Sequence, residues 1–126
     1  MTIWAKTFGI LGSVNAALAI ILGAFGAHAL KDHLSPELLA TYETGVQYHL
    51  YHGLGLLLAA ALVLYAPRSI ALKWSGLVMQ VGILLFSGSL YALSLSGIRW
   101  IGAITPFGGL AFITAWVLLA LAIWCA

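Results

Sequence analysis

The sequence predicts an all-α fold, an integral membrane four-helix bundle built from two helical hairpins with short loops. Hydrophobic residues occupy 63% of the 126 positions and charged residues only 6%, whereas soluble domains carry about a quarter charged residues. Four apolar runs lie at 7–30, 41–66, 70–95 and 105–125. Each holds about 20 residues or more, the length of helix that crosses a hydrocarbon core of about 30 Å. We therefore expect a single membrane domain over residues 1–126.

The residues that precede the second and fourth apolar runs favour helix starts. Ser35 is a good N-cap, Pro36 suits the first helical position, and Glu37 places an acid in the first turn. Thr105 and Pro106 open the last run by the same logic. Because a backbone in lipid must satisfy its own hydrogen bonds, all four runs are expected to be helices.

Aromatic residues mark the two ends of the expected bundle. The end that carries both termini, here called the terminal face, has Trp4, Tyr65, Trp74 and Trp124. The opposite end, here called the hairpin face, has Tyr42, Tyr91 and Trp100. Two such belts are expected where a helical protein meets the membrane–water interfaces. Trp116 is the exception, because it falls at mid-membrane in the last run.

The distribution of cations favours one orientation. Three cations belong to the terminal face and two to the hairpin face, namely Lys6, Arg68 and Lys73 against Lys31 and Arg99. Since cytoplasmic loops carry an excess of Lys and Arg, we expect both termini in the cytoplasm. The net charge of +2 is too small to indicate nucleic-acid binding, and the single cysteine, Cys125, precludes an internal disulfide.

Two amides lie deep in the first and third helices. Asn15 and Gln80 are each about ten residues from the terminal face, so they are expected at similar depth. A hydrogen bond between them, contributing about 0.6–2 kcal/mol, is the economical interpretation. A polar translocation path through these amides is the alternative.

Polar and ionisable residues gather at the hairpin face. This hairpin-face cluster is the candidate binding site, and it comprises His28, Glu43, Tyr48, His49, His52, Tyr91 and Arg99. Ionisable groups within membrane spans suggest function by default. An apolar run that begins at residue 41 puts His49 and His52 in the first turns of the second helix, a few residues below the interface. Gly45 and Gly53 fall on their side of the helix and would admit another backbone or a ligand.

Three interpretations of the histidines stay open. They are neutral imidazoles hydrogen-bonded within the fold, or a site for a small ligand, proton or headgroup, or ligands of a metal or haem. A metal needs three or four donors at about 2.0–2.2 Å. His49 and His52 supply two, His28 could add a third, and Glu43 only if its helix rotates favourably. No haem-attachment motif is present, so no cofactor is assigned and the metal question is left open.

Four segments carry a resemblance to a known family. They are GAFGAHAL at 23–30, YETGVQYH at 42–49, LFSGSLY at 85–91 and ITPFGG at 104–109. In this order, over nearly the whole chain, they resemble the small inner-membrane family catalogued as a domain of unknown function, number 423, which is related to small eukaryotic transmembrane proteins. The resemblance implies four spans in a bacterial-type plasma membrane. It implies no established activity and no catalytic residues.

The sequence supports three classes of function unequally. An enzyme is the least supported, because the chain offers no set of nucleophile, base and orienting group and no carboxylate deep in the membrane. A transporter or channel would need a homo-oligomer to enclose a path, since four short helices mostly fill their own centre. We favour a binding or accessory bundle that engages membrane lipid or another membrane protein, with the hairpin face as its recognition end.

Overall fold

The computed structural model describes residues 1–126 and is all-helical. Its four long helices are α1 (Ile3–Phe25), α2 (Pro36–Tyr65), α3 (Ile70–Ser96) and α4 (Thr105–Trp124). A π-helical turn, Gly26–Leu30, extends α1, and a 3-10 segment, Arg99–Ala103, precedes α4. All four helices, with these extensions, are long and apolar enough to cross a membrane. The predicted fold class is therefore confirmed.

Side-chain caps set where three of the helices begin. Thr2, Ser35 and Ser69 each accept a hydrogen bond from the backbone N–H three residues later, at 3.2–3.3 Å. The expected cap by Thr105 is absent, since Thr105 is itself the first residue of α4. At the other end of α3, Gly97 adopts the left-handed conformation with φ 73°, which suits a glycine at this position of a helix end. Since caps and not hydropathy define the starts, α2 begins five residues before its apolar run.

The early start of α2 changes the depth of the histidines. His49 and His52 lie 13 and 16 residues after Pro36 in a helix of 30 residues, which is about 20 and 24 Å along its axis. The expectation that they occupy the first turns of the second helix is therefore wrong. They lie at its middle, the part farthest from both membrane surfaces.

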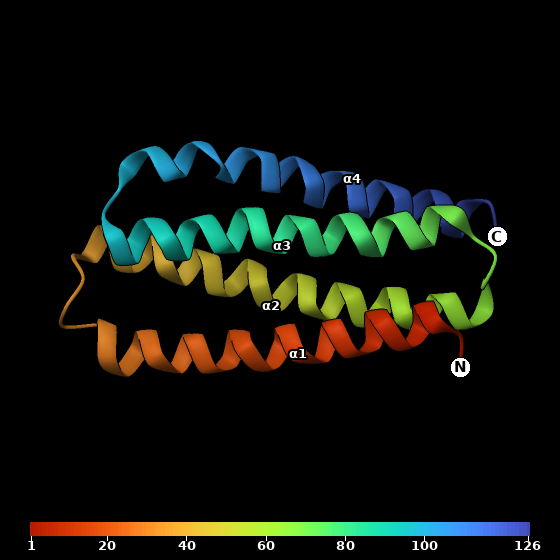
Figure 1. The fold of residues 1–126 in the computed structure, drawn as a ribbon, viewed down its shortest axis with the longest axis horizontal. Helices are drawn as coiled ribbons and strands as arrows, with labels where there is room; N and C mark the ends of the chain where they lie inside the picture. The colour runs from red at the N-terminus through yellow and green to blue at the C-terminus, as the bar shows by residue number, and fades with distance from the viewer.

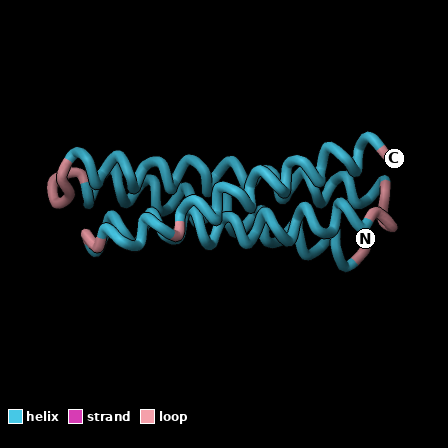
Figure 2. The backbone as a smooth tube through the Cα atoms, turned by 90° about the horizontal axis from the view of Figure 1, so that it is seen from above, coloured by secondary structure: helices cyan, strands magenta, loops and turns pink.

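The helices run alternately up and down, and each packs against its neighbour in sequence. Figure 1 shows them side by side in the order α1, α2, α3, α4, with both termini at one end. The packing is concentrated in the pairs α1–α2, α2–α3 and α3–α4, and α1 scarcely meets α3. In the view turned by 90°, the connections between the long helices again lie toward the two ends of the long axis, and one short loop segment lies farther in, where the 3-10 segment meets α4 (Figure 2). Helices two apart in sequence therefore make few contacts with each other.

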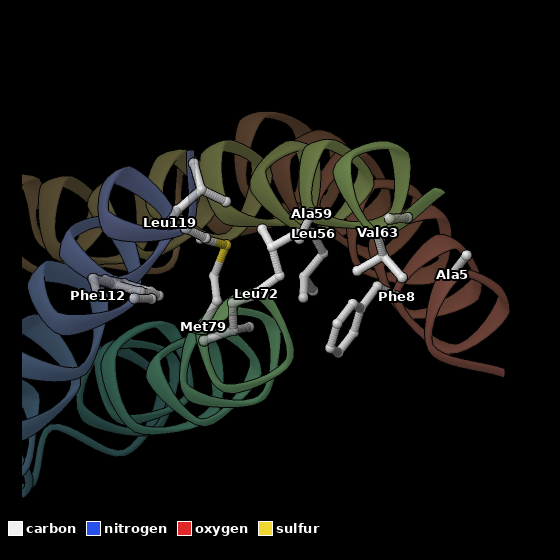
Figure 3. Packing of buried hydrophobic residues seen from close by; sticks show 13 residues of the cluster. Ala5, Phe8, Leu56, Ala59, Val63, Leu72, Met79, Phe112 and Leu119 are labelled. Carbon is white, nitrogen blue, oxygen red and sulfur yellow. The ribbon is translucent and has the colours of Figure 1, made fainter. Parts of the chain in front are cut away.

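The core is divided along the membrane normal. Its hydrophobic half lies toward the terminal face and contains Phe8, Leu56, Val63, Met79 and Leu119, which meet in Figure 3. Of the buried polar side chains, Asn15, His49 and His52 lie near the middle of their helices, and Ser87, Ser89 and Ser94 lie toward the hairpin face. Ser75 is the one buried polar side chain near the terminal face. The buried polar chemistry therefore lies at the middle of the bundle and on its hairpin side.

Glycines allow α1 and α2 to approach closely. A Cβ on Gly12 would lie 2.7 Å from the carbonyl oxygen of Gly53, and a Cβ on Gly53 would lie 3.1 Å from the Ala16 nitrogen. Gly45 instead faces the Tyr91 ring, which a Cβ at that position would approach to 3.0 Å. The two glycines that flank His49 in sequence thus admit the α1 backbone and an aromatic ring.

We predict that Gly12→Ala destabilises the protein by about 1–3 kcal/mol, because the new methyl group meets backbone atoms that can yield only if the helices separate. Gly88→Ala is the matched control, since a Cβ there meets nothing within 4 Å, and it should be neutral or stabilising by up to about 1 kcal/mol. Reversible unfolding in detergent measures both. Equal stabilities for the two variants would contradict the close α1–α2 packing.

Candidate functional site

Four side chains from three helices form one hydrogen-bonded chain, here called the amide–histidine network. His49 Nε2 lies 2.9 Å from Asn15 Oδ1, and His49 Nδ1 lies 2.9 Å from the Tyr91 hydroxyl. Asn15 Nδ2 donates to Gln80 Oε1 at 2.8 Å. The predicted hydrogen bond between the two deep amides is thus present. The structure adds that it continues through His49 of α2 to Tyr91 of α3.

Donor and acceptor chemistry fixes which nitrogen of a neutral His49 ring carries the proton. Asn15 Nδ2 donates to two oxygens, those of Gln80 and of the Leu11 carbonyl, so Asn15 Oδ1 faces the imidazole. A carboxamide oxygen can only accept, which requires the proton of His49 to be on Nε2. The Nδ1 atom of the neutral ring then accepts from the Tyr91 hydroxyl.

His52 takes part in a second, separate arrangement. Trp116 Nε1 lies 3.0 Å from His52 Nε2, and His52 Nδ1 lies 2.7 Å from the Tyr48 carbonyl oxygen. An indole N–H can only donate, so His52 Nε2 is unprotonated and Nδ1 donates to Tyr48. The ring also stacks on Phe112, with centroids 3.4 Å apart. This arrangement accounts for Trp116, the one tryptophan at mid-membrane.

The two histidines therefore hold opposite neutral tautomers, and each ring has both nitrogens engaged. A metal ion would have to displace Tyr91 from His49 or Trp116 from His52. Moreover, no three His, Cys, Asp or Glu side chains come together in a way that could hold a metal ion. In this geometry neither His49 nor His52 offers a free ring nitrogen to a metal ion or a haem iron.

The seven residues of the hairpin-face cluster do not form one site. The structure joins His49 to Tyr91 and His52 to Tyr48. The other members, His28, Glu43 and Arg99, are exposed at the surface. Arg99 lines a separate cavity of about 330 Å³ at the hairpin face.

Sequence reasoning missed the aromatic partners of these polar groups. Phe86 and Phe112 pack with the Tyr48 ring, at centroid distances of 4.6 and 6.3 Å. The unusual mid-membrane position of Trp116 was the one feature of the sequence that could have indicated an aromatic partner for a polar group. Tyr42 was assigned only to the interfacial belt, yet its hydroxyl donates to the Leu22 carbonyl. Its ring occupies the space that Gly26 leaves free at the π-helical turn.

Two grooves open between helices that are two apart in sequence. One, here called the α2–α4 groove, has a volume of about 490 Å³. Its lining is largely aromatic and comprises Tyr48, Tyr51, His52, Phe86, Gly109, Phe112, Ile113 and Trp116. The second lies between α1 and α3 and has a volume of about 230 Å³. Part of the amide–histidine network lines it, namely Asn15, His49 and Tyr91.

Comparison with known proteins places the chain in a family. The family model described as a protein of unknown function (DUF423) matches residues 22–109. The chain is 49% identical over 117 residues to the UPF0382 membrane protein YwdK of Bacillus subtilis, which covers 93% of this chain and 95% of that protein. A UPF0382 membrane protein of Staphylococcus saprophyticus is 48% identical over 116 residues, covering 92% and 95%. No solved structure matches. The chain belongs to the DUF423 family and is a membrane protein.

We predict that Asn15→Leu lowers the free energy of unfolding by about 1–3 kcal/mol, because it leaves the His49 Nε2–H and the Gln80 Oε1 without partners in a buried site. Ser13→Leu, on the exposed side of the same helix, should change it by less than about 0.5 kcal/mol. Unfolding in mixed detergent micelles compares the two variants. If they are equally stable, the network does not hold the three helices together.

Proposed function

We propose that this member of the DUF423 family is a membrane-embedded binding protein that holds a lipid-soluble molecule in the α2–α4 groove. The observation that supports this function is the groove itself, a cavity of about 490 Å³ with aromatic walls and few polar groups. Ligand sites in proteins are typically concave, mostly apolar and largely preformed. The groove has these properties.

The position of the groove decides what can enter it. Its lining residues belong to the middle of α2 and to α3 and α4, all membrane-crossing helices. Tyr51 and Ile113, on its rim, are 53% and 63% exposed, so the groove opens sideways. The medium on that side of a spanning helix is hydrocarbon. A molecule dissolved in the bilayer therefore has direct access, whereas a water-soluble one does not.

The interior of the bundle supports a static binding role over a pore. Every buried side-chain nitrogen and oxygen has a hydrogen-bond partner within the chain, and no Lys, Arg, Asp or Glu is buried. Opening a path through the monomer would break the hydrogen bonds of His49 or His52. The groove, in contrast, can fill and empty while both arrangements stay intact.

A contact between two copies of the chain is the second candidate, and a separate observation favours it. Glu43 and Gln47 are exposed on a spanning helix, and the four-residue spacing puts them on one face. An exposed amide such as that of Gln47 promotes helix association in membranes. A carboxamide both donates and accepts, so Gln47 residues of two copies can pair across a two-fold axis.

For location, we propose the inner (plasma) membrane with both termini in the cytoplasm. Both termini lie at one end of the molecule (Figure 1), the end that carries Lys6, Arg68 and Lys73. The terminal face has one more Lys or Arg residue than the hairpin face, and this excess supports the orientation. At the same end, the Lys73 ammonium lies over the Trp4 ring, 5.9 Å from its centroid.

Filling the α2–α4 groove should displace what it holds. Gly109→Leu places a larger side chain in the groove, where a Cβ would still be 4.0 Å from its nearest neighbour, Phe86. We predict that native mass spectrometry shows several-fold less retained lipid-soluble ligand on this variant. Leu110→Phe is the control, because Leu110 is exposed on the same helix outside the groove. Equal retention by both variants would count against the proposed site.

Cross-linking tests the contact between copies. With Cys125 changed to serine, Gln47→Cys in native membranes should give a disulfide-linked dimer on mild oxidation. The matched control, Ile20→Cys, lies on the exposed side of α1 at 64% exposure and should not cross-link. Absence of the dimer at position 47, or equal cross-linking at position 20, would refute a specific contact through this face of α2.

A further inference from the structure

The geometry points to a neutral, flat, carbonyl-bearing ring of the quinone class as the ligand of the α2–α4 groove. This inference rests on the proposed binding function and names the kind of molecule that the groove recognises. It is a statement about binding, and it assigns no electron transfer to the protein. Four features of the groove carry it.

The first feature is a pair of phenolic hydroxyls in the hydrocarbon. Tyr48 and Tyr51 line the groove with side chains 37% and 53% exposed. The Tyr48 carbonyl accepts from His52, but neither tyrosine hydroxyl donates to an acceptor within the chain. A hydroxyl in an apolar medium without a hydrogen bond is unfavourable. A ligand that carries a hydrogen-bond acceptor gives these hydroxyls a partner and removes the unfavourable free energy.

The second feature is depth. Tyr51 lies 15 residues after Pro36 and 14 before Tyr65, the two ends of α2, so it is about 20 Å from either end of the helix. The ester carbonyls of a phospholipid stay at the edge of the hydrocarbon, about 15 Å from its centre. A phospholipid therefore brings only its alkyl chain to Tyr51. An acceptor at this depth belongs to a molecule that dissolves wholly in the hydrocarbon.

The third feature is the flatness of the walls. The Tyr48 and Phe86 rings pack with centroids 4.6 Å apart and a tilt of 38°, and Phe112 lies parallel to the His52 ring within 5°. Aromatic faces arranged in this way favour stacking of another flat ring over random filling by a flexible chain.

The fourth feature is the chemistry that the groove lacks. No charged side chain lines it. The acceptor nitrogen of His52 is already used by Trp116, so the imidazole offers no free group to the ligand. The groove lining therefore combines two tyrosines whose hydroxyls have no acceptor within the chain with flat apolar rings, and these match the carbonyl oxygens and ring of a neutral quinone.

The test uses the 126-residue protein in detergent micelles. Decyl-benzoquinone is the probe, and decylbenzene, which has the same alkyl chain and a ring without carbonyls, is the competitor. We expect saturable quenching of tryptophan fluorescence by the quinone, since Trp116 lines the groove. The double variant Tyr48→Phe/Tyr51→Phe keeps both rings and should bind the quinone about tenfold more weakly, through loss of two hydrogen bonds. Tyr65→Phe, an exposed tyrosine near the terminal face, should bind as the wild type does.

The outcomes separate this inference from the function on which it rests. One outcome is that decylbenzene binds with the same affinity as the quinone while the double tyrosine variant binds the quinone as the wild type does. In that case the groove binds apolar molecules without recognising carbonyl groups. The quinone inference is then overturned while the binding function stands. If the quinone shows no saturable binding and Gly109→Leu retains as much lipid as the wild type, both are overturned. Thermal unfolding of each variant verifies that it is folded.

Discussion

A polar side chain inside a bilayer must find its hydrogen-bond partners within the protein, and this constraint organises the middle of the bundle. His49 meets it by joining Asn15 of α1 and Tyr91 of α3. Because Asn15 also binds Gln80, three helices share one chain of hydrogen bonds. The energy of such a chain in a membrane is modest for each bond, but its directionality fixes the rotation and depth of each helix.

The same constraint explains why the two histidines behave differently. His49 faces α1 and α3, whereas His52, three residues later, turns toward α4 and accepts from Trp116. This second interaction holds the Phe112 and Trp116 rings against α2 at mid-membrane depth. The aromatic wall of the α2–α4 groove is therefore a consequence of satisfying His52. The polar core and the candidate binding surface are parts of one arrangement.

Composition and the lengths of the apolar runs were sufficient to predict the four helices, because hydrocarbon thickness leaves few other solutions. The Asn15–Gln80 hydrogen bond was predictable from depth alone. The sequence does not predict that His49 and His52 belong to separate hydrogen-bonded arrangements. That separation depends on the rotation of α2 about its axis and on Trp116, which is 64 residues away from His52 in the sequence. The depth of His49 expected from the sequence is wrong because it counts from the apolar run at residue 41, although Ser35 and Pro36 correctly predict that the helix begins five residues earlier.

The interior of the bundle depends on His49 and His52 being neutral and holding opposite tautomers. Nitrogen NMR of protein labelled with 15N at histidine, reconstituted in lipid at neutral pH, tests it directly, with each signal assigned by a single-histidine variant. We predict that His49 carries its proton on Nε2 and His52 on Nδ1, as their partners Asn15 and Tyr48 require. The same tautomer at both positions, or an imidazolium spectrum at either, would contradict the account.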